Sequence, residues 1–267
     1  MISLIIPTKN EERDIGRCLE SLKSQDYSQI EIIVVDNYSA DRTCKIAKKY
    51  TTKVFTKGPE RSYQRNFGAR KATGEILFFL DADMEIERCL LEEVEYLLGK
   101  DPKIKGLVVP EKTVGRHLLA RIRALERSCY LSEPSIEAAR IFPRKFFLKI
   151  GGFDENMIAA EDWDLTQRVY QVGKIGRTKS KIIHHEESLS LLSHLRKKYY
   201  YAKDIQEYAR KHPSNFESQS GVTRLELFAK NWRKMVADPV LGLGVLILKS
   251  LEYSVFLLAK LKTGYET

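Results

Sequence analysis

Two aspartates stand two positions apart directly after a run of large apolar residues. The run is Ile76–Leu80, and Asp81 and Asp83 follow it. A continuous apolar run of this kind is typical of a buried strand, so both carboxylates would leave the sheet together. Carboxylate oxygens suit Mg²⁺ or Mn²⁺, and a cation held there can bridge to a diphosphate. A pair of solvated loop acids is the alternative that this motif alone leaves open.

A second set of polar groups follows two earlier apolar runs. Asp36 comes directly after Ile30–Val35, and a carboxylate at a buried strand end can accept the N–H of a uracil or guanine ring. Asp41 is the better N-cap for the following helix, so we expect Asp36 to stay free. The two strand ends predict a nucleotide pocket that contains Pro7, Thr8, Asn10, Glu11, Asp36 and Asn37.

Basic residues precede the aspartate pair. Arg61 and Arg65 are four positions apart in a segment with the pattern of a helix, so they share one helix face. Two guanidinium groups on one face can clamp phosphates. A solvated basic helix is the alternative.

The elements that must position these groups alternate between strands and helices. Short apolar strands separated by helices of about ten residues or more indicate a mostly parallel sheet with helices on both faces. Ligands of such sheets bind at the carboxyl ends of the strands, which is where the polar groups stand. We expect strands over Leu4–Pro7, Ile30–Val35, Lys53–Thr56, Ile76–Leu80, Leu107–Pro110, Ala138–Phe142 and Lys181–His185, and helices over Arg61–Ala72, Arg88–Leu98, His117–Leu131 and Glu161–Val172, with a further helix opened by Asn10.

Five segments in order carry a family resemblance. They read IPTKNEE, EIIVVDNYSADRT, QRNFGARKATGEILFFLDAD, GGFDE and AEDWDLTQRV. With these segments the chain resembles the family 2 glycosyltransferases over roughly residues 1–190. The resemblance implies the GT-A fold, which is an α/β, Rossmann-like domain with a mostly parallel sheet. It also implies an inverting transferase that takes a sugar from a nucleotide-diphospho-sugar.

The resemblance assigns donor-site roles to residues of this chain. Thr8, Asn10, Glu11 and Asp36 would line the nucleoside site, Arg65 and Asn66 would approach the donor, and Asp81 and Asp83 would hold the metal and the diphosphate. The family often has Asp-Asp-Gly-Ser where this chain has DNYS over Asp36–Ser39. That difference falls at the contacts to the base, so UDP and GDP donors both stay open.

The resemblance also implies an acceptor side. Glu161 and Asp162 match the family's acidic pair, and Asp162 would be the base that deprotonates the acceptor, with Glu161 or Asp164 as substitutes. Favourable charge at a helix N-terminus is the structural alternative for this pair. His184 and His185 end the last expected strand, where GT-A enzymes often present a metal-binding histidine. Neighbouring side chains on a strand face opposite sides, so only one of the two would reach a metal, and we favour His184. Two histidines without a ligand role are the alternative.

The last part of the chain is basic. The net charge is +9, and residues 190–267 hold 13 basic and 7 acidic residues. We expect a transferase domain over 1–189 and a basic helical extension over 190–267 that meets an anionic membrane surface. Pro239–Leu261 is long enough to span a bilayer, but Lys249 and Glu252 in its middle disfavour spanning. A helix on the membrane surface, or one packed on the protein, is favoured instead.

The sequence therefore predicts a metal-dependent, inverting glycosyltransferase at the cytoplasmic face of the membrane. Attachment is expected to be peripheral, with one C-terminal helix as a candidate anchor. Mn²⁺ or Mg²⁺ is the expected cofactor, a UDP- or GDP-sugar the donor, and a lipid-linked carrier or glycan the acceptor. No nucleic-acid partner is expected.

Two alternative functions stay open. One is a sugar-1-phosphate nucleotidyltransferase, which is disfavoured because no Gly-rich loop follows the first strand. The other is a non-catalytic, membrane-associated binding module. Four scattered cysteines predict free thiols.

Overall fold

The computed structural model describes residues 1–187, 189–202, 205–217 and 220–262. They fall into two compact units. Unit 1 consists of Met1–Glu111, Ala138–Asn156 and Glu161–His184, and unit 2 of Lys112–Glu137, Met157–Ala160 and His185–Thr267. Unit 2 includes the segment 190–267 that we expect as an extension, and it also takes in residues 112–137. Positions 203–204, 218–219 and 263–267 of that extension lie outside the described residues.

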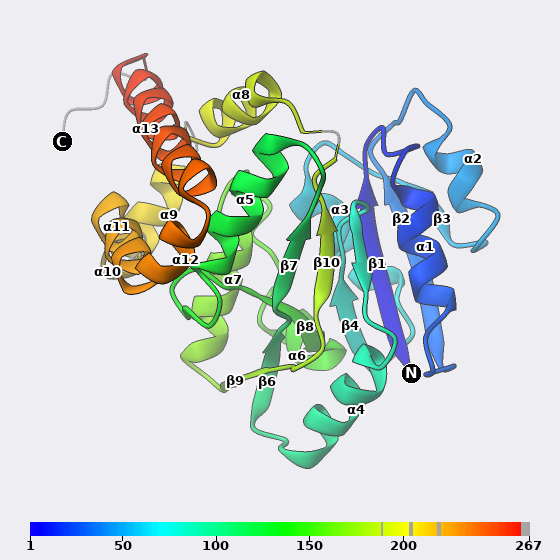
Figure 1. Ribbon diagram of the computed structural model, residues 1–267. Helices are drawn as coiled ribbons and strands as arrows, with labels where there is room; N and C mark the ends of the chain where they lie inside the picture. Colours follow the sequence, from blue (N-terminus) through cyan, green and yellow to red (C-terminus); the bar gives the residue numbers. More distant parts are fainter. Residues whose placement is uncertain (188, 203–204, 218–219, 263–267) are drawn as a thin grey trace. The chain divides into compact units, whose positions relative to one another are not determined.

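Unit 1 is built on a seven-stranded sheet with the order β3-β2-β1-β4-β8-β6-β9 (Figure 1). Its strands are β1 (Ile2–Thr8), β2 (Ile30–Asp36), β3 (Val54–Thr56), β4 (Ile76–Phe79), β6 (Ile104–Val108), β8 (Ala139–Pro143) and β9 (Lys174–Arg177). β1 is parallel to β2 and β4, β2 to β3, and β6 to β9, whereas β8 is antiparallel to β4 and β6. The expectation of a mostly parallel sheet is confirmed.

Helices cover both faces of this sheet because its strands are apolar on both sides. Leu4 and Ile6 of β1 belong to one buried cluster, and Ile5 between them belongs to another. The first cluster includes residues of α1, α2 and α4, and the second includes residues of α3, α6 and α7. These helices are α1 (Ile15–Lys23), α2 (Thr43–Ala47), α3 (Arg61–Lys71), α4 (Leu90–Lys100), α6 (Arg144–Lys149) and α7 (Glu161–Tyr170).

A small second sheet follows the aspartate pair. It has the order β5-β10-β7, and β10 runs antiparallel to β5. Its strands are β5 (Met84–Ile86), β7 (Glu111–Val114) and β10 (Ile182–His185). The pairing places His184 opposite Met84, one residue after Asp83.

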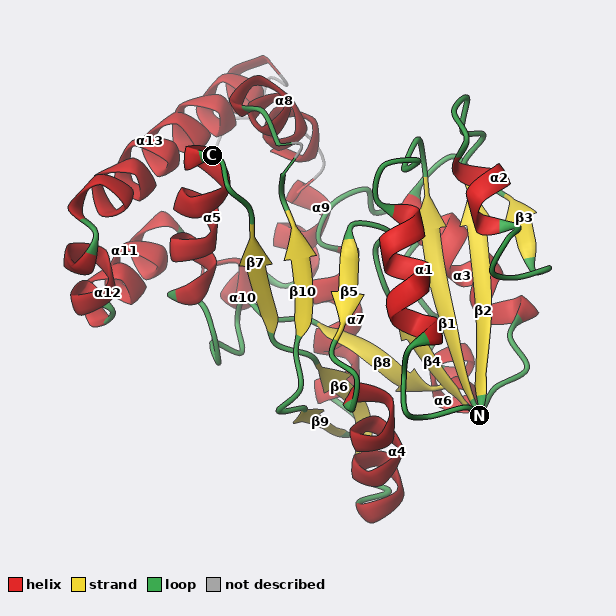
Figure 2. Ribbon diagram, turned by 45° about the vertical axis from the view of Figure 1, so that its right-hand side comes forward, coloured by secondary structure: helices red, strands yellow, loops and turns green. Residues whose placement is uncertain are grey.

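Unit 2 is mainly helical (Figure 2). Its helices are α5 (Leu118–Ser128), α8 (Leu191–Ala202), α9 (Ile205–Lys211), α10 (Pro213–Glu217), α11 (Gly221–Lys230), α12 (Trp232–Ala237) and α13 (Pro239–Lys262). The long helix α13 packs against α5, α8 and α12. A buried cluster that includes Ile122 of α5, Phe228 of α11 and Val245 of α13 holds these helices together.

Two features of the chain differ from the sequence-based expectations. The first helix begins at Ile15 and not at Asn10, because the backbone N–H groups of Glu11 and Glu12 donate to Thr43 at the start of α2 and to Asp41 just before it. Strands β5, β7 and β9 are not among the expected strands, since each has only three or four residues and carries charged side chains. All four cysteines are free thiols, as expected.

Candidate active site

Thr8, which follows Pro7 at the carboxyl end of β1, lies opposite Asp36 at the carboxyl end of β2. The Thr8 hydroxyl donates to Asp36 Oδ1 (2.8 Å), and Ser39 donates its N–H to Oδ2 (2.7 Å) and its hydroxyl to Oδ1 (2.6 Å). Tyr38 has a φ of 52°, which folds the chain back so that Ser39 reaches the carboxylate. Asp41, as expected, binds the start of α2, where its Oδ1 accepts the Thr43 N–H (2.9 Å). Asp36 does not take that role, but it is not without partners, because its two oxygens hold the strand ends together.

Three further residues of the predicted nucleotide pocket tie the neighbouring loops together. The Asn10 side-chain oxygen accepts the N–H of Ala40 (2.9 Å). The Glu11 N–H donates to the Thr43 hydroxyl (2.7 Å). The Asn37 side-chain amide donates to a backbone carbonyl of the loop before α3 (2.5 Å). The structure thus brings the predicted residues of β1 and β2 into one polar cluster at the carboxyl edge of the sheet.

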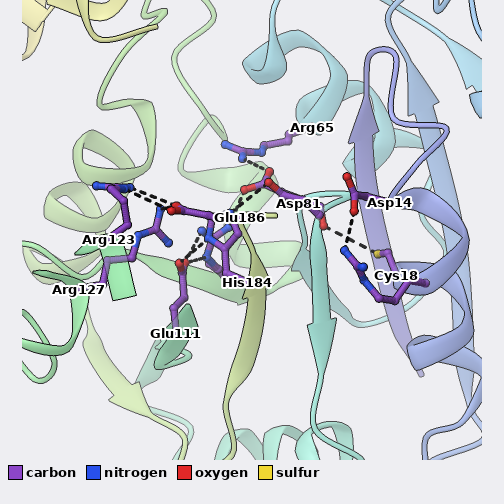
Figure 3. A network of polar contacts seen from close by, with 12 residues as sticks. Asp14, Cys18, Arg65, Asp81, Glu111, Arg123, Arg127, His184 and Glu186 are labelled. Atoms are coloured by element: carbon purple, nitrogen blue, oxygen red, sulfur yellow. Dashed lines mark hydrogen bonds and ion pairs between the residues drawn. The ribbon is translucent and has the colours of Figure 1, made fainter. Parts of the chain in front are cut away.

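Arg65 connects the aspartate motif to the acidic pair of α7. Its side chain is only 5% exposed, and it donates to Asp81 Oδ1 (2.8 Å) and Glu161 Oε1 (3.0 Å). Figure 3 shows Arg65 reaching Asp81. Arg61, one turn earlier on α3, lies 3.9 Å from Glu161 Oε1. The shared helix face that the sequence predicts for the two arginines is therefore directed at carboxylates of this cluster.

Arg140 on β8 and Glu111 on β7 were not among the predicted site residues. Arg140 lies 3.3 Å from Asp81 Oδ2 and donates to Glu111 Oε1 (2.6 Å). Burial alone would raise the pKa of Asp81, but Arg65, Arg140 and Arg61 outweigh it and hold that pKa well below its usual range. The sequence signals were an arginine inside an apolar strand and a glutamate directly after one.

His184 lies between two carboxylates. Its Nε2 is 3.1 Å from Asp83 Oδ2, and its Nδ1 is 3.4 Å from Glu111 Oε2. Figure 3 shows the His184 ring beside Glu111. A histidine whose second ring nitrogen meets a carboxylate has the arrangement that orients metal-ligating imidazoles. His185 follows on the opposite side of the strand and is assigned to unit 2.

Asp83 and His184 are the donors that fit a divalent cation. Asp83 Oδ1 is buried and has no hydrogen-bond partner among the described residues. Both oxygens of Asp81, in contrast, already face guanidinium groups. No group of three or more acidic, histidine or cysteine ligands was found in the described part of the chain. A cation here would take its remaining ligands from a substrate phosphate and water, as Mg²⁺ usually does.

The acidic pair stands at the N-terminus of α7. Glu161 is buried, and burial followed by the adjacent Asp162 raises the pKa of its carboxyl group. Asp162 is half-buried, and its Oδ1 accepts the N–H of Trp163 (2.8 Å). Ala160 just before the pair has a φ of 62°, which is unusual for a residue with a Cβ. Of the two carboxylates, Asp162 is the more accessible to a second substrate.

Asn66 performs a structural task. Its side-chain amide donates to the Phe153 carbonyl (2.8 Å) and to Glu155 Oε1 (3.0 Å), and its oxygen accepts the Phe153 N–H (3.0 Å). The side chain therefore holds the GGFDE loop against α3. Gly152 of that loop has a φ of 67°, and a Cβ there would lie 2.5 Å from Asn66 Oδ1.

Comparisons with known proteins agree with this architecture. The sequence profile of glycosyl transferase family 2 matches residues 3–149, more than half of the chain. The glycosyltransferase AglE of Haloferax volcanii is 38% identical over 188 residues, which cover 64% of this chain and 62% of AglE. This chain thus spans less than two thirds of that curated relative.

Solved structures share the fold. The mannosyltransferase PcManGT from Pyrobaculum calidifontis, in complex with GDP-Man and Mn²⁺, aligns with a TM-score of 0.67 at 17% identity, over 99% of this chain and 88% of that chain. Staphylococcus aureus TarS 1–349 in complex with UDP-GlcNAc aligns with a TM-score of 0.52 at 23% identity, over 76% and 66% of the two chains. The fold is that of the GT-A proteins, and the chain belongs to glycosyl transferase family 2.

Proposed function

We propose that this protein is an inverting, metal-dependent glycosyltransferase. It moves a sugar from a nucleotide-diphospho-sugar to a hydroxyl or phosphate group of a lipid-linked carrier or a glycan. The observation that carries this proposal is one continuous chain of charged contacts at the sheet edge. It runs from the acidic pair through Arg65 to Asp81, and from there through Arg140 and Glu111 to His184 and Asp83.

The donor would bind where these charges meet the strand ends of β1 and β2. Two proteins with the same fold support a nucleotide-sugar donor, because TarS 1–349 was solved with UDP-GlcNAc and PcManGT with GDP-Man and Mn²⁺. A divalent cation held by Asp83 and His184 would take up the charge that develops on the diphosphate. Arg61 and Arg65 place positive charge next to the same carboxylates and suit phosphate oxygens.

Asp162 would act as the general base. The acceptor oxygen attacks C1 of the sugar, the bond from C1 to the phosphate oxygen breaks, and the acceptor proton passes to the Asp162 carboxylate. Glu161 is buried and paired with Arg65 (3.0 Å), so it is less available for this transfer. Attack from the face opposite the leaving nucleoside diphosphate inverts the configuration at C1.

We also place the protein peripherally at the cytoplasmic face of a membrane. The helix Pro239–Leu261 supports this location, because it is long and apolar enough to cross a membrane and only 17% of its most apolar window is buried. The excess of basic residues over 190–267 suits an anionic lipid surface.

The test is a transfer assay on the full chain with UDP- and GDP-sugars, Mn²⁺, and either a polyprenyl phosphate or a glycan acceptor. We expect release of the nucleoside diphosphate and a product of inverted anomeric configuration by NMR. Asp162→Asn should lower kcat by about 10²–10⁴-fold while the donor Kd stays unchanged. Asp101→Asn, at a surface ion pair with Lys174, is the matched control and should keep wild-type turnover.

Three results would contradict the proposal. Wild-type turnover by the Asp162→Asn variant would show that Asp162 is not the general base. Pyrophosphate release from a nucleoside triphosphate and a sugar-1-phosphate would indicate a nucleotidyltransferase. Donor binding without any turnover would indicate a non-catalytic binding module.

A further inference from the structure

Helix α13 of unit 2 turns its apolar side outward and its charged side inward. Val240, Leu243, Ile247, Leu258 and Leu261 are each between 53% and 78% exposed. At 3.6 residues per turn these positions form one stripe along the helix. Among the α13 side chains that the structure describes, no charged one is exposed. A helix that packs on a soluble core shows the opposite arrangement, with its polar side in water.

Two serines, Ser250 and Ser254, lie on the described part of this stripe, and both hydroxyls are hydrogen-bonded without water. Ser250 donates to the Leu246 carbonyl (3.0 Å), and Ser254 donates to the Ser250 carbonyl (2.9 Å). Serines that bond to the carbonyl four residues earlier are satisfied within their own helix. The stripe is therefore suited to contact with hydrocarbon, where every donor must find an internal partner.

The charged side of α13 is fixed by polar contacts to α5 and α8, among them an ion pair between Glu252 and Lys198 of α8 (3.6 Å). Lys249 contacts Glu126 and lies 2.6 Å from Glu252 Oε2. Glu252 Oε1 lies 2.6 Å from His194 Nε2, and Glu126 lies 2.9 Å from Arg123. Glu126 is 1% exposed and Glu252 is 11% exposed. Separating buried pairs of this kind is costly, so the rotation of α13 about its own axis is set.

The segment just before α13 has the composition of a lipid headgroup contact. Lys230 and Arg233 are exposed, and Trp232 between them is 57% exposed. Tryptophan favours the boundary between headgroups and hydrocarbon, and basic residues favour anionic lipids. A second copy of this chain would bring the same positive charge to the contact, which disfavours a dimer through this surface.

We infer that α13 is an interfacial membrane helix. It lies in the plane of an anionic bilayer, with the exposed stripe in the hydrocarbon boundary and the charged side held by α5 and α8. A crossing orientation would carry Lys249 and Glu126 into the bilayer or pull them apart. This inference rests on the membrane location in the proposed function and names the surface responsible for it. It does not depend on the sugar-transfer chemistry.

The experiment is co-sedimentation of the full chain with vesicles of phosphatidylglycerol and phosphatidylcholine, in the absence of donor and acceptor. The double variant Ile247→Glu/Leu258→Glu should lower the partition coefficient by roughly tenfold or more, because membrane affinity scales with the buried apolar area. Val172→Glu is the matched control, since Val172 is 63% exposed on unit 1. Circular dichroism should show the same helix content for all three proteins. Alkaline carbonate should release the bound wild type.

Three other outcomes overturn the inference. If the wild-type protein stays in the supernatant when the vesicles sediment, an anionic lipid surface is not its partner. Resistance to carbonate indicates a crossing helix. A dimer in analytical ultracentrifugation that the double variant abolishes, without vesicle binding, assigns the stripe to a second copy. Vesicle binding by a variant that has lost turnover leaves this inference intact and counts only against the proposed function.

Discussion

Asp81 and Asp83 belong to one motif but have different surroundings. Asp81 faces Arg65 at 2.8 Å and Arg140 at 3.3 Å, so its charge is already balanced. Asp83 faces His184, and its Oδ1 is buried without a hydrogen-bond partner among the described residues. A buried oxygen without a partner is costly unless a ligand completes it. We therefore expect Asp83 to contact the metal and Asp81 to orient the two arginines.

Gly152 allows a residue-scale prediction about the loop that Asn66 holds. Gly152 has a φ of 67° and Gly151 a φ of 90°, so a Cβ at either position costs about 1–2 kcal/mol in backbone strain. Only at Gly152 would the new Cβ also collide, with Asn66 Oδ1 at 2.5 Å and with the Phe147 ring at 3.1 Å. Gly152→Ala should therefore lose about 1–3 kcal/mol more stability than Gly151→Ala.

Thermal unfolding of the two glycine variants checks this comparison. Gly151→Ala is the internal control, because nothing lies within 4 Å of its added Cβ. We expect a Tm several degrees lower for Gly152→Ala than for Gly151→Ala. Equal Tm values would mean that the Asn66 side chain moves away at no cost and does not fix the loop.

The sequence predicts some site residues well because they stand next to strands. Thr8, Asp36 and Asp81 follow apolar runs, and parallel strands carry such positions to one edge. Arg140 and Glu111 could not be predicted in the same way. Their partners come from strands that are distant in the chain, and β8 enters the sheet antiparallel. No local pattern contains that pairing.

At the scale of elements, the ion pairs between α5 and α13 are the main constraint on unit 2. Burial would raise the pKa of Glu126, but Lys249 and Arg123 outweigh it and lower that pKa to about 2. Glu126→Gln would remove the carboxylate that Lys249 and Arg123 share, although Lys249 keeps Glu252 and Arg123 keeps Glu186. Removing one member of a buried pair costs about 3–5 kcal/mol, so we expect the Tm of unit 2 to fall by roughly 10 °C.

The pH dependence of this loss follows from the direction of the pKa shift. A carboxyl group with a lowered pKa stabilises the fold above its unfolded pKa, near 4.5, and loses that contribution as the pH falls toward about 2. The difference in the free energy of unfolding between wild type and Glu126→Gln should therefore be largest at pH 7 and should decrease as the pH falls from about 4.5 to 2. Glu226→Gln, at an exposed position of α11, should match wild type throughout. A stability difference that does not change with pH would refute the claim that the Glu126 charge stabilises the fold.

For the whole molecule, periodicity predicts six of the seven strands in the large sheet of unit 1 but not which residues make up unit 2. Strands such as β1 and β2 are short apolar runs, and α1 between them has a clear apolar stripe, whereas β9 carries charged side chains. Residues 112–137 look like a continuation of the first domain, yet they belong to unit 2 because Glu126 and Ile122 pack with α13. Such long-range packing is not visible in local periodicity.

The most direct test of the central claim is the thermal unfolding of the full chain with UDP or GDP, each with Mn²⁺ or with a chelator. A ligand at 100 times its Kd adds about 2.7 kcal/mol, which corresponds to a Tm shift of roughly 5–10 °C here. We predict a shift with one nucleotide, only with Mn²⁺, that Asp83→Ala abolishes and Asp101→Ala retains. A metal-dependent shift that persists in Asp83→Ala, or no shift with either nucleotide, would contradict a metal and donor site at the edge of this sheet.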